Sequence, residues 1–269
     1  FTSITAYREW DNTEIREGDF LSGERFFTNN PPPGDPLVRI FELHDLGPQE
    51  WRQFSQEFRV TSPSGQRFEY VAGAFIWNAQ SDRSFTRNTV ECLASPLPVD
   101  ATGLSPCEPG VSTFQNASAT ATFDTEYENY ALFGNGTFHV SDSFRFLGGL
   151  RVTHDKVSFN HFRTNNNISD VNPDGIPGPG VLTGVQSTAA DTDNTELTGK
   201  AGLQYDVNDE ITTYFTYSRG YKGPAFNVFF NHRAGRDDVP IAEETANSYE
   251  LGFKSKLFDN TTLFNVALF

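Results

Sequence analysis

The sequence contains no methionine and only two cysteines in its 269 residues. It also begins without a signal peptide, so we expect an interior piece of a longer chain. No stretch approaches the roughly 18 consecutive apolar residues that a membrane-spanning helix requires. Hydrophobic residues make up only 37% of the chain and the mean hydropathy is −0.47. These values argue against a helical membrane protein and against a soluble protein with a thick core.

Basic residues are scarce. The chain has 20 Lys and Arg against 35 Asp and Glu, which gives a net charge of −15 and a pI near 4.7. Nucleic-acid binding needs clustered Lys and Arg, so we expect no nucleic-acid partner. Segment 11–50 alone holds nine acids and three bases. It could attract cations, including divalent ions that bridge lipopolysaccharide, or it could be a solvated loop.

Signatures of catalysis are also missing. We find no Gly-rich phosphate loop, no nucleophile elbow and no coupled Ser/His/Asp pattern, so we expect no enzyme, no catalytic residue and no cofactor. The five histidines show no metal-binding spacing, and no metal site is expected. His154 and His161 border one long predicted loop and could touch a metal chelate, but scattered lumen or surface positions are the simpler explanation.

The two cysteines, Cys92 and Cys107, lie in one Pro/Ser-rich stretch. Such a close pair predicts a local disulfide formed in an oxidising compartment. The alternative is two unrelated thiols.

Phenylalanine is abundant, at 26 residues, and the aromatic residues are spread along the chain in a period of two. Alternation of this kind predicts β-strands with one apolar and one polar face. The predicted apolar face carries Phe54, Tyr70, Leu132, Phe146, Leu203 and Phe253. The predicted opposite face carries Glu57, Arg151, Lys200 and Lys254.

About nine such strands are expected, joined by connections of two alternating lengths. Short turns are predicted near 62–66, 141–143, 207–210 and 258–261, and long loops near 11–50, 80–126, 160–194 and 223–246. Short turns at one end and long loops at the other are typical of outer-membrane barrels, whose inner face is wet. The fold class predicted is therefore all-β, an antiparallel meander forming an open arc of a large barrel. A two-sheet sandwich with a solvated outer face is the alternative.

Four stretches, in order, give the chain a family resemblance: "FSQEFRVTSP", "YALFGNGTFHVSDSFRFLGGLRVTHD", "YSRGYKGPAFN" and "ETANSYELGFKSKLFDN". They resemble the TonB-dependent outer-membrane receptors, specifically the iron-complex branch. Pro224 and Ala225 stand where that family often has glycines. The resemblance covers almost the whole chain outside the long loops, so we expect residues 1–269 to be a partial barrel domain.

The resemblance implies a multi-pass barrel in a Gram-negative outer membrane that imports a scarce solute such as a ferric siderophore. It implies a barrel of about 22 strands plugged by an N-terminal domain, and a TonB complex that supplies the energy through an N-terminal region absent from this chain. Outer-membrane lipid would surround the barrel. A passive porin and a secreted carbohydrate-binding sandwich are the alternatives.

The stretch 217–227 predicts the end of a membrane strand. Tyr217 and Tyr221 share one face and fit the aromatic girdle at the membrane interface. Pro224 lacks the N–H that a strand ladder needs, so pairing should stop there. The loop that follows should lie outside the cell above the barrel mouth. Its candidate ligand-binding residues are Phe226, Asn227, Phe229 and Phe230; packing against neighbouring loops is the alternative role.

Overall fold

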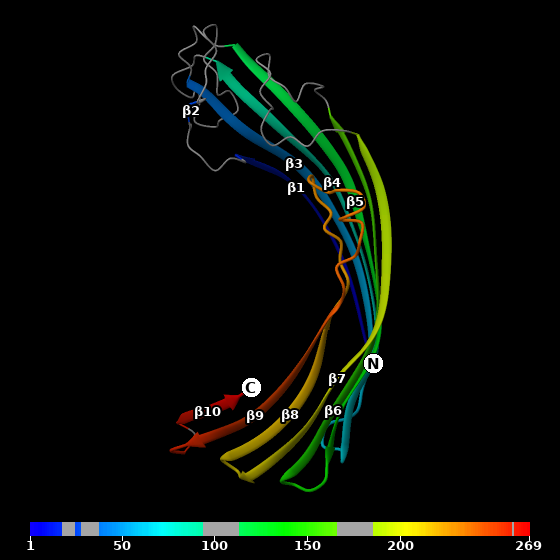
Figure 1. The fold of residues 1–269 in the computed structure, drawn as a ribbon. Helices are drawn as coiled ribbons and strands as arrows, with labels where there is room; N and C mark the ends of the chain where they lie inside the picture. Colours follow the sequence, from blue (N-terminus) through cyan, green and yellow to red (C-terminus); the bar gives the residue numbers. More distant parts are fainter. Residues whose placement is uncertain (18–24, 28–37, 94–112, 166–184, 260) are drawn as a thin grey trace.

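The chain forms a single curved antiparallel sheet (Figure 1). The computed structural model describes residues 1–17, 25–27, 38–93, 113–165, 185–259 and 261–269. Its strands are β1 (Thr2–Glu17), β2 (Arg25–Phe27), β3 (Val38–Thr61), β4 (Phe68–Leu93), β5 (Thr113–His139), β6 (Phe144–Asn165), β7 (Gln186–Asn208), β8 (Ile211–Lys222), β9 (Glu244–Leu257) and β10 (Thr262–Leu268). No helix among these residues has the length and hydropathy to cross a bilayer.

Strands adjacent in sequence are adjacent in space. The order is β1-β3-β4-β5-β6-β7-β8-β9-β10, and the short β2 pairs with β3 off this path. Nine strands in one open meander confirm the predicted fold class. A sandwich requires two stacked sheets, and all strands of the described residues belong to one sheet, so that alternative is wrong.

The register confirms the two predicted faces. Directly opposed residues of antiparallel strands lie on the same face. One cross-strand row joins Phe58, Ala74, Leu132, Val152 and Leu197, and another joins Phe68, Phe138, Phe146, Leu203, Phe215 and Leu251. Glu57 lies in an adjacent row on the opposite face, opposed to Phe75. A slip of one residue would have mixed the two sets.

Large apolar side chains remain exposed on the first of these faces. In β4 this exposed set runs from Phe68 to Ile76, and in β5 from Tyr130 to Phe138. Each span is about nine residues, close to the roughly 9–11 that a tilted strand needs to cross a bilayer. Across β4 to β7 the row just beyond it is polar and holds Asn78, Glu128, Lys156 and Asp193, whereas β3 places Phe54 in this row. The apolar face is therefore a band of membrane width with a polar upper border.

The strands are much longer than predicted. Strands β3 to β7 have 22 to 27 residues each, or roughly 70–90 Å at about 3.3 Å per residue. The predicted loop starts at 11, 80 and 160 were therefore wrong, because each position lies within a strand. Beyond the membrane band polar side chains occur on both faces. The hydrophobic alternation that marks a strand in the sequence disappears there, although the backbone ladder continues.

The predicted short turns all lie at one end of the sheet (Figure 1). The β3–β4 turn closes with Ser62 N–H donating to Tyr70 O at 2.9 Å, and Gly65 adopts φ +75° within it. The β9–β10 turn has Phe258 and Asp259 at φ 54° and 53°, the left-handed pair found in tight hairpins.

The loop 223–243 does not extend away from the sheet. Strand β8 ends at Lys222, as the Lys-Gly-Pro sequence predicted. The chain then turns back inside the curve of the sheet, shown in orange in Figure 1, and rejoins it at Glu244. We call the face that this loop contacts the concave wall. The exposed apolar band lies on the convex side.

Candidate functional site

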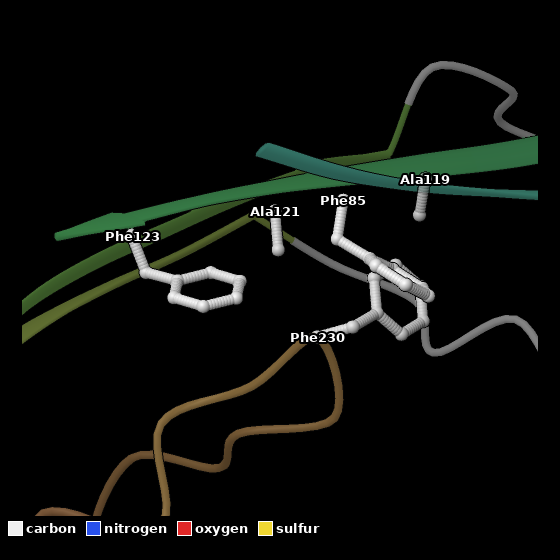
Figure 2. Close-up of a cluster of buried hydrophobic side chains, with 5 residues drawn as sticks. All are labelled: Phe85, Ala119, Ala121, Phe123 and Phe230. Carbon is white, nitrogen blue, oxygen red and sulfur yellow. The ribbon is translucent and has the colours of Figure 1, made fainter. Parts of the chain in front are cut away.

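A buried hydrophobic cluster forms where the loop 223–243 meets the concave wall (Figure 2). Its members are Phe85, Ala119, Ala121, Phe123 and Phe230. Phe230 is only 1% exposed, and its ring centroid lies 5.5 Å from that of Phe85. Phe229 lies 4.8 Å from the same ring. The small alanines of β5 leave room for the loop's rings, so the loop packs into the wall.

Two arginines of β4 lie over these rings. The Cζ of Arg83 is 5.0 Å from the Phe229 centroid, and the Cζ of Arg87 is 5.1 Å from the Phe230 centroid. Arg87 also donates from Nε and Nη2 to the two carboxylate oxygens of Asp45, at 2.7 and 2.9 Å. Asp45 is only 1% exposed, and the bidentate hydrogen bonds from the Arg87 guanidinium compensate its buried negative charge. Cation–π contacts thus add to the apolar packing of the loop.

Polar side chains of β6 and β7 hold the loop's main chain. Arg163 Nη1 donates to the carbonyl oxygens of Phe230 and His232, at 3.0 and 2.9 Å. Gln186 Nε2 donates to the same His232 oxygen at 3.0 Å. Arg163 is 4% exposed and its burial lowers the pKa of the guanidinium. Since the loop forms no strand, these donors satisfy carbonyls that a sheet ladder would otherwise pair.

Two histidines face each other across the contact. The ring of His161 in β6 stacks on His232 of the loop, with centroids 4.8 Å apart and planes at 30°. His161 also stacks on Phe123 at 5.8 Å, and its Nε2 lies 3.0 Å from Phe229 O. Burial, and to a smaller extent the neighbouring His232, lower the pKa of His161 to about 4. His161 is therefore neutral near pH 7.

The loop has its own internal support around Asp237. The carboxylate accepts from Arg233 N–H at 2.8 Å and from Arg236 Nε and Nη2 at 2.8 and 2.5 Å. The bond from Arg236 is the main cause that lowers the pKa of Asp237 to about 2. Ala225 and Ile241 exchange two main-chain hydrogen bonds, at 3.1 and 2.7 Å, across the base of the loop. The loop is thus a shaped element with a closed neck.

The structure separates the four candidate ligand-binding residues. Phe230 is buried in the wall, Phe229 is half-buried against Phe85, and Phe226 packs edge-on against Phe159 at 4.9 Å. Asn227 is exposed, and a hydrogen bond from its side chain helps to lower the pKa of Asp237. All four lie against or near the concave wall, so the loop lies inside the curve. The packing partners of the rings are the wall strands.

The two predicted interface tyrosines have different contacts. The centroid of the Tyr217 ring lies 5.1 Å from that of Tyr249 on the convex face. This position is compatible with the predicted place of Tyr217 at the lipid interface. Tyr221 instead accepts a hydrogen bond from Asn194 Nδ2 at 3.3 Å, and Asn194 lies on the concave face, opposed to Asp155. Pairing of β8 with β7 ends at Arg219, which frees the strand to turn beyond that point. The unbroken register with β9 places Tyr217 opposite Tyr249 and Tyr221 opposite Thr245, so both tyrosines leave β8 on the same face, and their place at the membrane interface stays a prediction.

Other predicted features lie beyond what the structure describes. Cys107 falls outside the described residues, as does the side chain of Cys92, so the disulfide stays a prediction. Much of segment 11–50 is likewise outside them. Within the described residues, no group of three or more His, Cys, Asp or Glu side chains is arranged to hold a metal ion.

Sequence reasoning missed the wall side of the contact. Phe85, Phe123 and Phe159 are aromatic residues on the parity opposite to the predicted apolar face, a signal that could have marked an inner packing site. The pairing of His161 with His232 had no such signal, because 70 residues separate them and the connection depends on how the loop turns.

Comparison with known proteins decides which barrel this sheet belongs to. The family model "TonB dependent receptor-like, beta-barrel" matches residues 2–269. The chain belongs to the TonB-dependent receptors. The apolar convex band is thus the lipid-facing surface of an outer-membrane barrel, and the concave wall faces its lumen.

Several individual receptors are similar to this chain. The pesticin receptor of Yersinia pestis is 26% identical over 239 residues, covering 88% of this chain and 28% of the receptor. The catecholate siderophore receptor Fiu of Escherichia coli K12 is 22% identical over 222 residues, covering 78% and 28%. The chain therefore spans less than a third of the curated relatives it matches.

Solved structures support the fold. The ferric yersiniabactin uptake receptor FyuA from Yersinia pestis superposes with a TM-score of 0.58 at 19% identity, covering 97% of this chain and 35% of FyuA. The siderophore receptor PiuA from Acinetobacter baumannii gives 0.50 at 11% identity, covering 98% and 40%. At such identities the likeness concerns the arrangement of strands in the TonB-dependent receptor barrel.

Proposed function

We propose that this chain forms part of the barrel of an outer-membrane transporter that binds and imports a ferric siderophore or a similar iron complex. The observation that carries this proposal is the family match over residues 2–269. Support for the ligand class comes from the relatives, which are named as receptors for pesticin and for catecholate siderophores. The TonB complex would supply the energy through a region outside this chain.

The two faces of the sheet agree with that role. The convex band exposes apolar side chains over a membrane-wide span, as contact with outer-membrane lipid requires. The concave wall carries charged and hydrogen-bonding groups, including Arg151, Lys200 and Lys254, as a solvated lumen requires. A polar lumen alone would also suit a passive pore. Family membership favours an energised receptor instead.

The inward-folded loop carries the residues that we propose as ligand contacts: Phe226, Asn227, Phe229 and Phe230. Support comes from their place: the loop lies inside the curve of the sheet, beyond the membrane band on the side away from the short turns, where it would line the path of an incoming solute. Asn227 is exposed and offers both a donor and an acceptor. Phe226 and Phe229 are half-buried, and small shifts of the loop would expose their rings to an apolar part of a siderophore.

The experiment that tests the function uses the full-length receptor in iron-starved cells. Uptake of radioactive iron would be measured for a panel of purified ferric siderophores, with the receptor gene present, deleted and restored, and with TonB present or deleted. We expect one siderophore class to be taken up only when both the receptor and TonB are present. Receptor-dependent uptake that persists without TonB would instead indicate a passive pore.

The loop contacts are tested in the same assay. The variant F226A/F229A/F230A should reduce siderophore binding and uptake by more than it reduces folded receptor in the membrane. The matched control is F162A, because Phe162 is 44% exposed on the convex side of β6 and lies away from the loop. Normal binding by the triple variant would leave these rings only their packing role.

A further inference from the structure

We propose that His161 and His232 form a proton-sensitive latch that holds loop 223–243 against the lumen wall and releases it as the pH falls. The latch is a property of the fold, and it stands or falls independently of which solute the receptor imports. Three observations carry it: the hydrogen-bond pattern of the two rings, their burial, and the charges around them.

The contacts define the proton positions on both rings. His161 Nε2 lies 3.0 Å from Phe229 O, and His232 Nδ1 lies 3.3 Å from Asn227 O. A carbonyl oxygen only accepts, so each of these nitrogens carries a hydrogen. In the neutral form of each ring, His161 Nδ1 and His232 Nε2 are then the nitrogens that carry no hydrogen. Both of these atoms are buried and have no hydrogen-bond partner among the described residues.

A proton added to this cluster would be poorly accommodated. His161 is 2% exposed and His232 is fully buried, so a charge on either ring loses its hydration. The new N–H on His161 Nδ1 would find no side-chain acceptor among the described residues, and the interaction with His161's own backbone offsets only part of the burial cost. The stacked rings lie 4.8 Å apart, so a charge on one ring also disfavours a charge on the other.

The surrounding charges do not remove this penalty. Wall strand β6 adds the cation Arg163, and β4 adds Arg83 and Arg87. The loop adds the cations Arg233 and Arg236. On the anionic side, Asp45 of β3 is held by Arg87, Glu14 of β1 pairs with Arg83, and Asp237 is held by Arg236. Strand β5 places only apolar side chains of the cluster here, and β7 places the uncharged Gln186 and Thr188.

Asp238 is the one carboxylate of this group that favours a protonated ring. It accepts from Thr188 Oγ1 at 3.4 Å, and its charge interacts with His232. Its influence falls on the loop histidine, whereas His161 sits beside Arg163. His161 is therefore the member of the latch whose pKa is lowered, and His232 is the ring it stacks on.

The direction of the pH effect follows from linkage. The pKa of His161 falls from 6.5 to about 4 on docking, so the released loop binds the proton more tightly than the docked loop. Docking is fully favoured above pH 6.5 and is progressively lost as the pH falls toward 4. With these two values, the docking equilibrium should fall roughly 30-fold between pH 7.5 and pH 5.

The test measures the loop position in the full-length receptor with spin labels. Native cysteines are replaced by serine, and A234C and D142C place labels on the exposed loop tip and on the exposed β5–β6 turn. Double electron–electron resonance then reports the distance distribution at pH 7.5, 6.5, 5.5 and 5, without siderophore or TonB. We expect one narrow docked population at pH 7.5 and a growing, broader, displaced population as the pH falls.

Two variants assign the effect to His161. H161Q keeps an amide donor for Phe229 O, and H161F keeps the ring stack; neither side chain titrates. Both should stay docked from pH 7.5 to 5. The matched control H154F removes a histidine of the convex face and should keep the wild-type pH response.

An unchanged wild-type distribution between pH 7.5 and 5 would overturn the proposal. A full pH response in both H161Q and H161F would assign the proton elsewhere and overturn it too. So would release of both variants already at pH 7.5, because a neutral side chain should leave the loop docked. Since no solute is present, these outcomes are separate from success or failure of the iron-uptake experiment.

Discussion

Truncation of Phe230 to alanine should release the loop 223–243 while leaving the barrel intact. Phe230 is 1% exposed, contacts the ring of Phe85 and lies under the guanidinium of Arg87. Removing a buried phenylalanine typically costs about 3–5 kcal/mol, which includes the apolar transfer and the cavity left behind. Aromatic and cation–π contacts form part of that loss. A loss of about 3 kcal/mol lowers the docking equilibrium by roughly 100-fold.

The destabilisation caused by F230A cannot exceed the free energy with which the loop docks on the wall. The loop is joined to the sheet only at β8 and β9 and can leave the wall without breaking a strand pair. Once it is released, further damage to the contact has no effect, so barrel stability should be nearly unchanged. Hydrogen exchange of peptides spanning 226–238 in the full-length receptor measures docking, and calorimetry measures barrel unfolding.

In the docked loop, the amides of His232 and Asp237 donate to Phe229 O and Arg233 O at 2.9 Å each, so they report its opening. F230A should increase their exchange by roughly the same 100-fold when opening limits exchange, with a barrel midpoint within a few degrees of wild type. F162A, on the convex side of β6, should change neither. Unchanged loop protection in F230A would refute the docking energetics, and a large fall in the barrel midpoint would show that the loop contact belongs to the barrel's own core.

Two further predictions concern the wall and the cysteines. G73A should lower the barrel's thermal midpoint, because an added Cβ would lie 2.3 Å from Phe58 O and close to the Phe133 ring. The control G148A should leave the midpoint unchanged, because nothing lies within 4 Å of its added Cβ. Equal midpoints for the two variants would contradict the register of β3, β4 and β5. Cys92 and Cys107 should form a disulfide that closes a loop of about 15 residues and adds roughly 3 kcal/mol to the free energy of unfolding in the chain-entropy model. Two free thiols, counted by mass spectrometry of the unreduced protein, would rule this out.

Much of the barrel wall could be predicted from the sequence. Within the membrane band, alternation of apolar and polar residues is a local property with a period of two, so "RQFSQEFRV" and "FRFLGGLRV" show their faces without any tertiary information. Short turns were equally visible, because Gly, Asp, Asn and Pro gather where the chain reverses. The strand extensions beyond the band were not, since a ladder with two polar faces has the same composition as a loop.

Within the membrane band, local alternation in the sequence distinguishes the lipid face from the lumen face, and Lys222-Gly223-Pro224 marks the end of β8. The position of the following loop depends on the tertiary fold. Its contact with the wall joins Phe85, Phe123, His161 and Phe230, which come from three strands and a loop. Sheet order brings the strands side by side, and the inward turn of the loop brings Phe230 and His232 onto them. A local sequence pattern cannot predict this contact, because the residues that surround each of its side chains are distant from it in the chain.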